Sequence, residues 1–298
     1  MTTRSSTDDL PHIGLALGGG GARGLAHITV LEVIEELGLP IACVAGTSIG
    51  SIIGWGVASG LSGRQMREIA LETFLDTREV AARVWKMRPK NWRNWRSFGV
   101  QLDSQAVLSA FMPDGLARTF DAASIPLTVM TTDYYGWRSH AVREGQIQPA
   151  VAASIAIPFV FKPVLFDGRV HVDGGVVNPL PTGALGDCDL VIGVDVMGGP
   201  EPGNGAEPAQ APAQMESILG ATQLCMQTIT RAHLAQHPPD VLIRPPIANF
   251  QALNFLKARD VLAAADGERD TIKRQLSEGV EAFLRGKDRS KAVTSSAL

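Results

Sequence analysis

Two glycine-rich turns near the start of the chain constrain its fold more than any other feature. The first is Gly-Gly-Gly-Gly-Ala-Arg-Gly at residues 18–24, and the second is Gly-Thr-Ser-Ile-Gly at residues 46–50. Each turn follows a short apolar run, at residues 13–17 and 41–45, and precedes a segment with helical spacing of its apolar residues. Two strand–turn–helix units in succession predict an α/β fold, in which both turns place backbone N–H groups at helix N-termini, where anionic charge is stabilised.

Composition narrows the class of protein. The 298 residues, 45% of them hydrophobic, are enough for one large α/β domain. The net charge of -3, with no basic arm, argues against nucleic acid as a partner. The three cysteines have no metal-ligand spacing and there is no calcium-type carboxylate cluster, so we expect neither a metal nor a cofactor. Since no secretory signal precedes the first strand, we expect a cytoplasmic location.

The chain is organised as one domain with flexible ends. We predict a flexible N-terminus at residues 1–12, a single catalytic domain at 13–285 and a disordered tail at 286–298. A stretch of Pro, Gly, Ala and Glu near residues 198–214 has almost nothing to bury and predicts a flexible loop inside that domain. Further strands are expected at 125–132, 137–143, 164–166, 169–172, 190–196 and 241–243, of which 164–166 and 169–172 form a hairpin around Asp167-Gly168. Helices are expected at 150–157, 215–236 and 257–284, the last broken near Gly267.

The segment at residues 78–99 is the most basic and aromatic part of the chain. It carries seven Lys and Arg residues against a single acid, Glu79, together with three of the five tryptophans. Such a segment suits peripheral contact with an anionic membrane, with tryptophan at the headgroup level and the cations at phosphate. A helix with a solvated basic face beside the active site is the alternative interpretation.

The second glycine turn has the pattern of a nucleophile elbow. Gly46 and Gly50 stand two positions on either side of Ser48, and allow a strained strand-to-helix turn that lifts the serine hydroxyl out of the sheet. A serine nucleophile needs a base within hydrogen-bond reach and N–H donors directed at the developing oxyanion. The alternative is a tight turn in which Ser48 only caps the following helix.

The first glycine turn suits an oxyanion hole, because consecutive glycines let backbone N–H groups approach a small anion closely. Gly19, Gly21 and Gly24 also fit the dinucleotide fingerprint of a nucleotide-binding oxidoreductase, which remains an alternative. That fingerprint requires an acid after the second strand, and the sequence has no acid at residues 37–67. Arg23 is expected either to hold the loop in place or to lie exposed.

The base for Ser48 is open between an aspartate and a histidine. Asp173 runs into Gly174 and Gly175 at a predicted strand end, where a carboxylate is held at the edge of a sheet. His171 is two residues away and shares a strand face with Asp173 unless a turn separates them. His233 and His237, late in the chain, are expected to be surface residues.

The three motifs at 18–24, 46–50 and 173–175, in this order, resemble those of the bacterial patatin-like phospholipases. The resemblance extends over residues 13–196 and includes Ala-Ser-Ile-Ala-Ile-Pro at 153–158 and Val-Asn-Pro-Leu-Pro at 177–181. It implies a three-layer α/β/α fold with a mostly parallel central sheet.

The same resemblance implies a serine lipid acyl hydrolase without histidine in its catalytic centre. Ser48 is then the nucleophile and Asp173 the base, and the substrate is a phospholipid, a lysophospholipid or a related fatty-acyl ester. A catalytically silent lipid-binding or regulatory protein is the remaining alternative. The backbone N–H groups of Gly19, Gly20 and Gly21 form the implied oxyanion hole, and Gly18, Arg23, Gly24, Gly46, Gly50, Gly174 and Gly175 complete the motifs.

Overall fold

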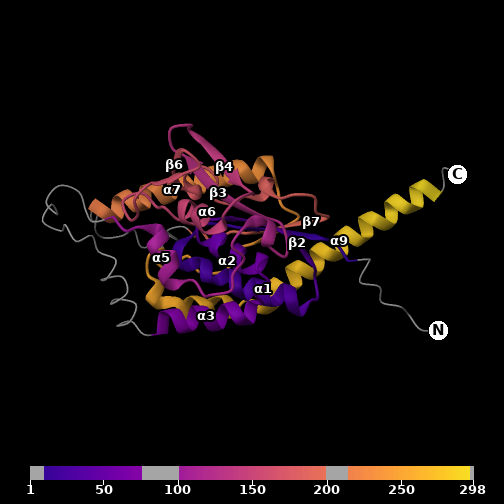
Figure 1. Ribbon diagram of the computed structural model, residues 1–298. Helices are drawn as coiled ribbons and strands as arrows, with labels where there is room; N and C mark the ends of the chain where they lie inside the picture. Colours follow the sequence, from indigo (N-terminus) through magenta and orange to yellow (C-terminus); the bar gives the residue numbers. More distant parts are fainter. Residues whose placement is uncertain (1–9, 76–100, 199–213, 296–298) are drawn as a thin grey trace, which may run out of the picture.

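The computed structural model describes residues 10–75, 101–198 and 214–295 (Figure 1). The predicted basic segment at 78–99 lies outside the described residues. So do nearly all of the predicted flexible N-terminus and of the loop near 198–214. Among the helices that the structure does describe, none combines the length and the apolar character needed to cross a bilayer.

The central sheet has eight strands within the described residues, and five of them run parallel. Leu17, the last residue of β1, pairs with Gly46 on one side and with Val194 on the other. The carboxyl ends of three neighbouring strands therefore lie at one edge of the sheet, and both glycine turns begin there. In spatial order the five are β3 (Leu127–Asp133), β2 (Ile41–Thr47), β1 (Ile13–Leu17), β7 (Leu190–Val194) and β8 (Val241–Ile243).

Three antiparallel strands complete the sheet around β3. They are β4 (Arg138–Val142), β5 (Val164–Phe166) and β6 (Arg169–Asp173), of which β5 and β6 form the predicted hairpin around Asp167 and Gly168. β4 pairs along β3 on one edge, so β2 and β6 must share the other edge. On that edge Thr47 pairs with Met130, and Asp173 pairs with Thr131, the next residue. β2 and β6 therefore meet end to end, which brings Asp173 beside Ser48.

Helices cover the two faces of the sheet unevenly, which confirms the predicted three-layer α/β fold with a mostly parallel sheet. One face carries a connected set of helices, namely α1 (Ala26–Glu36), α2 (Ile49–Ala58), α3 (Gly63–Leu75), α5 (Ser104–Phe111), α6 (Ile147–Ser154), α8 (Ala258–Asp266) and α9 (Arg269–Ser295). The other face is covered by α7 (Gln214–Gln236) and the short 3-10 turn η6 (Thr182–Ala184).

The alternation of side chains along the strands explains this asymmetry. Leu15 and Leu17 of β1 point into the main hydrophobic core beneath the helix-rich face, and both are fully buried. Gly14, on the opposite face of β1, has no room for a side chain, since a Cβ there would lie 2.5 Å from Cys188 Sγ. Small residues on that face thus let the segment around η6 pack directly on the sheet.

Two helices differ from their predicted bounds by more than one residue. α6 begins three residues before the predicted Ala150 and ends at Ser154, three residues before the predicted end at 157. It can begin early because Pro149 falls in its first turn, where a helix tolerates the missing N–H. α9 continues to Ser295, beyond Gly286, where the sequence predicts a disordered tail. No proline or glycine follows Gly286, so nothing in the sequence obliges the helix to stop there. The predicted break near Gly267 is confirmed as the boundary between α8 and α9.

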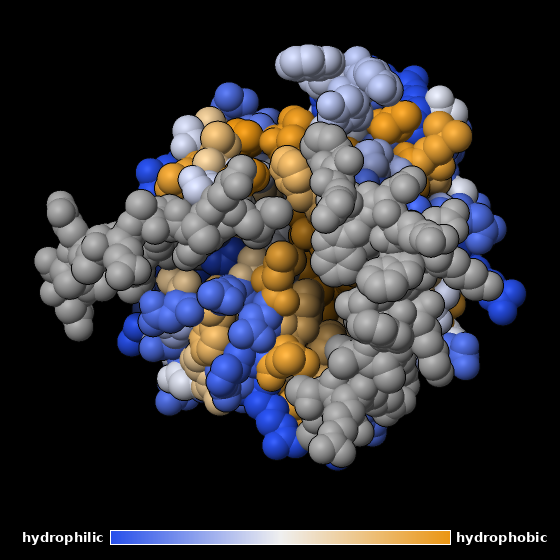
Figure 2. Space-filling model, turned by 90° about the vertical axis from the view of Figure 1, so that its left-hand side faces the viewer, coloured by the Kyte–Doolittle hydropathy of each residue, from blue (hydrophilic) through white to orange (hydrophobic). Residues whose placement is uncertain are grey.

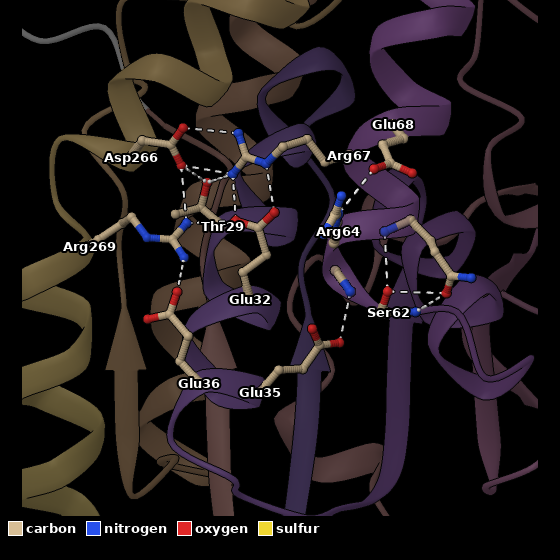
Figure 3. Close-up of polar contacts among 12 residues, drawn as sticks. Thr29, Glu32, Glu35, Glu36, Ser62, Arg64, Arg67, Glu68, Asp266 and Arg269 are labelled. Carbon is tan, nitrogen blue, oxygen red and sulfur yellow. Dashed lines mark hydrogen bonds and ion pairs between the residues drawn. The ribbon is translucent and has the colours of Figure 1, made fainter.

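An ion-pair network ties α1, α3, α8 and α9 together (Figure 3). Arg67 of α3 donates two hydrogen bonds to the Glu32 carboxylate of α1, at 2.6 and 2.7 Å, and two to Asp266 of α8, at 2.9 and 2.8 Å. Arg269 of α9 bonds to Glu32 as well, at 2.6 Å. Burial is the largest single effect on the pKa values of Glu32 and Asp266 and raises them. The hydrogen bonds and charges of the arginines together outweigh it, so both pKa values lie below their usual range. The network therefore fixes α3 against α1 and α8.

Candidate active site

Ser48 occupies a strained turn between β2 and α2. Its φ of 53° lies in the left-handed region, which costs a non-glycine residue about 1–3 kcal/mol. Gly46 and Gly50 make the turn sterically feasible. A Cβ at Gly46 would lie 2.3 Å from the Gly50 carbonyl oxygen, and a Cβ at Gly50 would lie 2.1 Å from the Leu17 carbonyl oxygen. Both glycines are therefore required by backbones that cross at close range.

The Ser48 hydroxyl donates a hydrogen bond to Asp173 Oδ2 at 2.6 Å. The other carboxylate oxygen, Oδ1, accepts the Gly175 N–H at 2.7 Å. Both side chains are buried, and burial raises the pKa of Asp173 to about 6, against the lowering effects of the Ser48 and Gly175 hydrogen bonds. A carboxylate with a pKa near neutrality, in contact with a serine hydroxyl, is suited to act as a general base.

Two further side chains fix the backbone on either side of this contact. Ser154 Oγ accepts the Ser48 N–H at 2.9 Å and donates to the Met130 carbonyl at 2.6 Å. Thr132 Oγ1 donates to the Asp173 carbonyl at 2.9 Å. No role for Ser154 or Thr132 was predicted from the sequence. Ser154 stands in one of the resemblance motifs, but its partner Ser48 is 106 residues away, and no local pattern reports that contact.

The glycine loop packs tightly beside Ser48. Gly18 donates its N–H to Val194 and Gly19 donates its N–H to Pro179, at 3.0 and 2.9 Å. The N–H groups of Gly20 and Gly21 have no hydrogen-bond acceptor among the described residues. A Cβ at Gly20 would lie 2.5 Å from the Val196 carbonyl oxygen. The loop thus leaves two of its three predicted oxyanion donors without an acceptor.

Arg23 and His27 hold the glycine loop through hydrogen bonds to its carbonyl groups. Arg23 is 3% exposed, and its Nε donates to the Gly20 carbonyl at 3.3 Å. Burial lowers the pKa of Arg23 to about 10 and that of His27 to about 4, so His27 is neutral, and its Nε2 donates to the Gly18 carbonyl at 2.9 Å. No role for His27 was predicted from the sequence. Its position four residues after Arg23, one helical turn further on, was the available signal.

The remaining motif glycines allow close approach. A Cβ at Gly24 would lie 2.2 Å from Ile49 Cγ2, and one at Gly174 would lie 2.2 Å from the Met130 carbonyl oxygen. A Cβ at Gly175 would lie 2.4 Å from Met226 Cε. Gly24 lies in η2 (Gly21–Leu25), and Gly174 and Gly175 lie in η5 (Gly174–Val176), so each glycine lets its short 3-10 helix pack closely against a neighbouring element.

Within the described residues, none of the three histidines considered as a base for Ser48 forms a hydrogen bond to it. His171 is buried, and its Nδ1 lies 3.0 Å from Thr131 Oγ1. His233 is half-buried rather than exposed, and its Nδ1 lies 3.3 Å from Asn178 Oδ1. The carbonyl of His237 accepts from Thr182. Asp173 is therefore the group that the fold presents to the serine. The described residues also contain no group of His, Cys, Asp and Glu side chains placed to hold a metal ion.

A cavity of about 520 Å³ opens beside Ser48. Its walls come mainly from α2, α3, α5 and residues within 155–161 and 253–256, with further contributions from η2 and α1. Apart from Ser48 and Thr73, the lining residues are apolar or glycine. Figure 2 shows the side of the molecule that lies on the left in Figure 1. Hydrophobic residues gather there in a hollow, with hydrophilic residues along part of its border. A serine hydroxyl at the wall of an apolar cavity is placed to meet an ester whose acyl part is a hydrocarbon.

The chain is similar in sequence to known proteins. An uncharacterised NTE family protein of Mycobacterium tuberculosis is 33% identical over 201 residues, which cover 66% of this chain and 53% of that protein. A lysophospholipase NTE1 of Yarrowia lipolytica is 28% identical over 284 residues, covering 84% of this chain and 18% of that protein. The chain thus spans about half of the first relative and less than a fifth of the second.

Among solved structures, VipD from Legionella pneumophila aligns with a TM-score of 0.47 and 12% identity, over 89% of this chain and 67% of that one. Human GIVD cytosolic phospholipase A2 aligns with a TM-score of 0.38 and 12% identity, over 95% and 61%. The sequence profile described as patatin-like phospholipase matches residues 15–185. More than half of the chain therefore matches that profile, and the chain belongs to the patatin-like phospholipase family.

Proposed function

We propose that this protein is a serine acyl hydrolase that cleaves fatty-acyl ester bonds of phospholipids, lysophospholipids or related esters through Ser48 and Asp173. The observation that carries the proposal is the 2.6 Å hydrogen bond between these two side chains at the wall of the apolar cavity. Burying an acyl chain in such a cavity contributes about 0.8 kcal/mol for each methylene group, which favours a lipid over a small polar ester. The relative from Yarrowia lipolytica is named a lysophospholipase, which supports the same class of substrate.

The reaction proceeds in two steps. Ser48 Oγ forms a bond to the acyl carbonyl carbon while its proton passes to Asp173 Oδ2, and the carbonyl electrons move onto the oxygen. The oxyanion accepts hydrogen bonds from the N–H groups of Gly20 and Gly21, the two that are without an acceptor in the loop. Gly19 contributes only if its bond to Pro179 opens. Collapse of the intermediate expels the alcohol, which takes the proton from Asp173, and water then releases the fatty acid by the same route.

The test is labelling and turnover. A fluorophosphonate probe is expected to label wild-type protein at Ser48, and Ser48→Ala is expected to remove both labelling and hydrolysis of a chromogenic fatty-acyl ester. Asp173→Asn keeps the shape of the side chain but removes the base, so turnover is expected to fall by at least about 100-fold. Ser109→Ala and Asp121→Asn change an exposed serine and an exposed aspartate, and are expected to leave activity unchanged.

Two results would contradict the proposal. Retained turnover in Asp173→Asn would exclude this carboxylate as the base. Liposome binding without labelling or turnover would favour a catalytically silent lipid-binding protein. Contact of residues 78–99 with an anionic membrane, and a cytoplasmic location, stay predictions from the sequence.

A further inference from the structure

One face of α2 forms a wall of the cavity. Ile49, Ile52, Ile53 and Gly56 all line the cavity, and their spacing of three and four residues puts them in a stripe along the helix. Ser48 stands at the N-terminal end of this stripe. At a rise of 1.5 Å per residue, Gly56 lies about 12 Å along the helix from Ser48. The cavity therefore follows α2 away from the serine.

Gly56 faces Met66 and Leu61, and both of these also line the cavity. A Cβ at Gly56 would lie 2.8 Å from Met66 Sδ and 3.7 Å from Leu61 Cδ1. A side chain at this position must therefore enter the cavity or push Met66 into it, and either outcome removes space. Met66 itself is 6% exposed, so it has little freedom to move outward.

The cavity is large enough for a long acyl chain. Its volume of about 520 Å³ falls in the range of ligand pockets, and its lining is almost entirely apolar. An extended chain advances about 1.2 Å per bond, as three backbone bonds span about 3.6 Å in an extended polypeptide. About ten carbons then reach from Ser48 to Gly56, and a longer chain must pass it.

We propose that Gly56 determines the acyl-chain length that the site accepts, because its missing side chain keeps open the part of the cavity beyond the tenth carbon. Chains shorter than about ten carbons do not reach this position. The inference rests on the proposed acyl hydrolase function, since it assigns the cavity to the acyl chain of the substrate. It makes Gly56 a residue that determines specificity and gives it no part in bond cleavage.

The experiment measures kcat/KM for p-nitrophenyl esters of four to sixteen carbons with the full chain. Gly56→Leu adds four carbon atoms, and each methylene that can no longer be buried lowers kcat/KM about fourfold. We expect a loss of at least about 100-fold for the sixteen-carbon ester and less than about threefold for the four- and eight-carbon esters. Gly56→Ala, a milder change, is expected to produce the same trend with a smaller loss.

Gly54→Ala is the matched control. It makes the same substitution in the same helix, but Gly54 does not line the cavity, and its Cβ would contact Val44 and Leu127 on the sheet side at 3.3 and 3.4 Å. We expect it to scale the rates for all chain lengths by the same factor. A chain-length profile of Gly56→Leu parallel to that of wild type would overturn the inference while leaving the hydrolase function intact. Absence of wild-type turnover on every ester would instead contradict the proposed function.

Discussion

Replacement of Asp173 by asparagine is expected to inactivate the protein and, at neutral and alkaline pH, to stabilise it. Burial raises the pKa of Asp173 from 3.8 to about 6, so the ionised carboxylate is costly in the folded state. Asparagine is the neutral analogue of the protonated carboxyl. Its Oδ1 can still accept the Gly175 N–H, and its amide can donate to Ser48 Oγ, so the two hydrogen bonds survive with one reversed in direction.

The size and pH dependence of the gain follow from linkage. Between pH 3.8 and about 6 the folded protein binds more protons at Asp173 than the unfolded chain does, so wild-type stability falls as the pH rises through this window. About two pKa units correspond to roughly 3 kcal/mol at pH 8. At pH 5 the unfolded carboxylate is already largely ionised and the folded one is largely protonated, which leaves about half of that difference.

Thermal denaturation at pH 8 and pH 5 tests this reasoning. For a chain of 298 residues 1 kcal/mol shifts Tm by about 1.6 °C, so Asp173→Asn is expected to raise Tm at pH 8 by about 5 °C and at pH 5 by about half as much. Asp121→Asn removes an exposed carboxylate and is expected to change neither value appreciably. A lower Tm at pH 8, or the same shift at both pH values, would refute the assignment of Asp173 as a buried carboxylate held against desolvation.

Three further outcomes are expected. Because Asp173 must be ionised to accept the serine proton, kcat/KM should rise with pH and reach half of its plateau near pH 6, and a flat profile from pH 5 to 8 would contradict this. Gly50→Ala forces a Cβ to 2.1 Å from a backbone oxygen, and should lower stability by more than about 3 kcal/mol in urea unfolding. Arg67→Met removes four hydrogen bonds to Glu32 and Asp266 and leaves Arg269 as the remaining cation beside both acids, so it should cost about 1–3 kcal/mol at pH 7. That loss should shrink as the pH falls through the lowered pKa values of the two acids, and a pH-independent loss would point to packing instead.

Elements with a local signal could be predicted from the sequence. β1 was predicted with the bounds that it has, and the Asp167-Gly168 hairpin was predicted because both residues suit the left-handed conformation that they adopt. The start of α6 was missed because Pro149 ordinarily argues against a helix and here falls in its first turn. Bounds of this kind depend on tertiary packing, which no single segment records.

The arrangement of the site depends on contacts that the sequence does not display. Local patterns place Ser48 at the end of one strand and Asp173 at the end of another, but they do not reveal that the two strands share one edge of β3. The histidine alternative stayed open for the same reason, since two residues on one strand face, such as His171 and Asp173, are equivalent until their neighbours are known. Register decides between them, because Asp173 pairs with Thr131, the residue after the partner of Thr47, whereas His171 pairs two residues further along β3. Two positions along β6 thus separate a carboxylate that contacts the serine from a histidine that packs in the sheet.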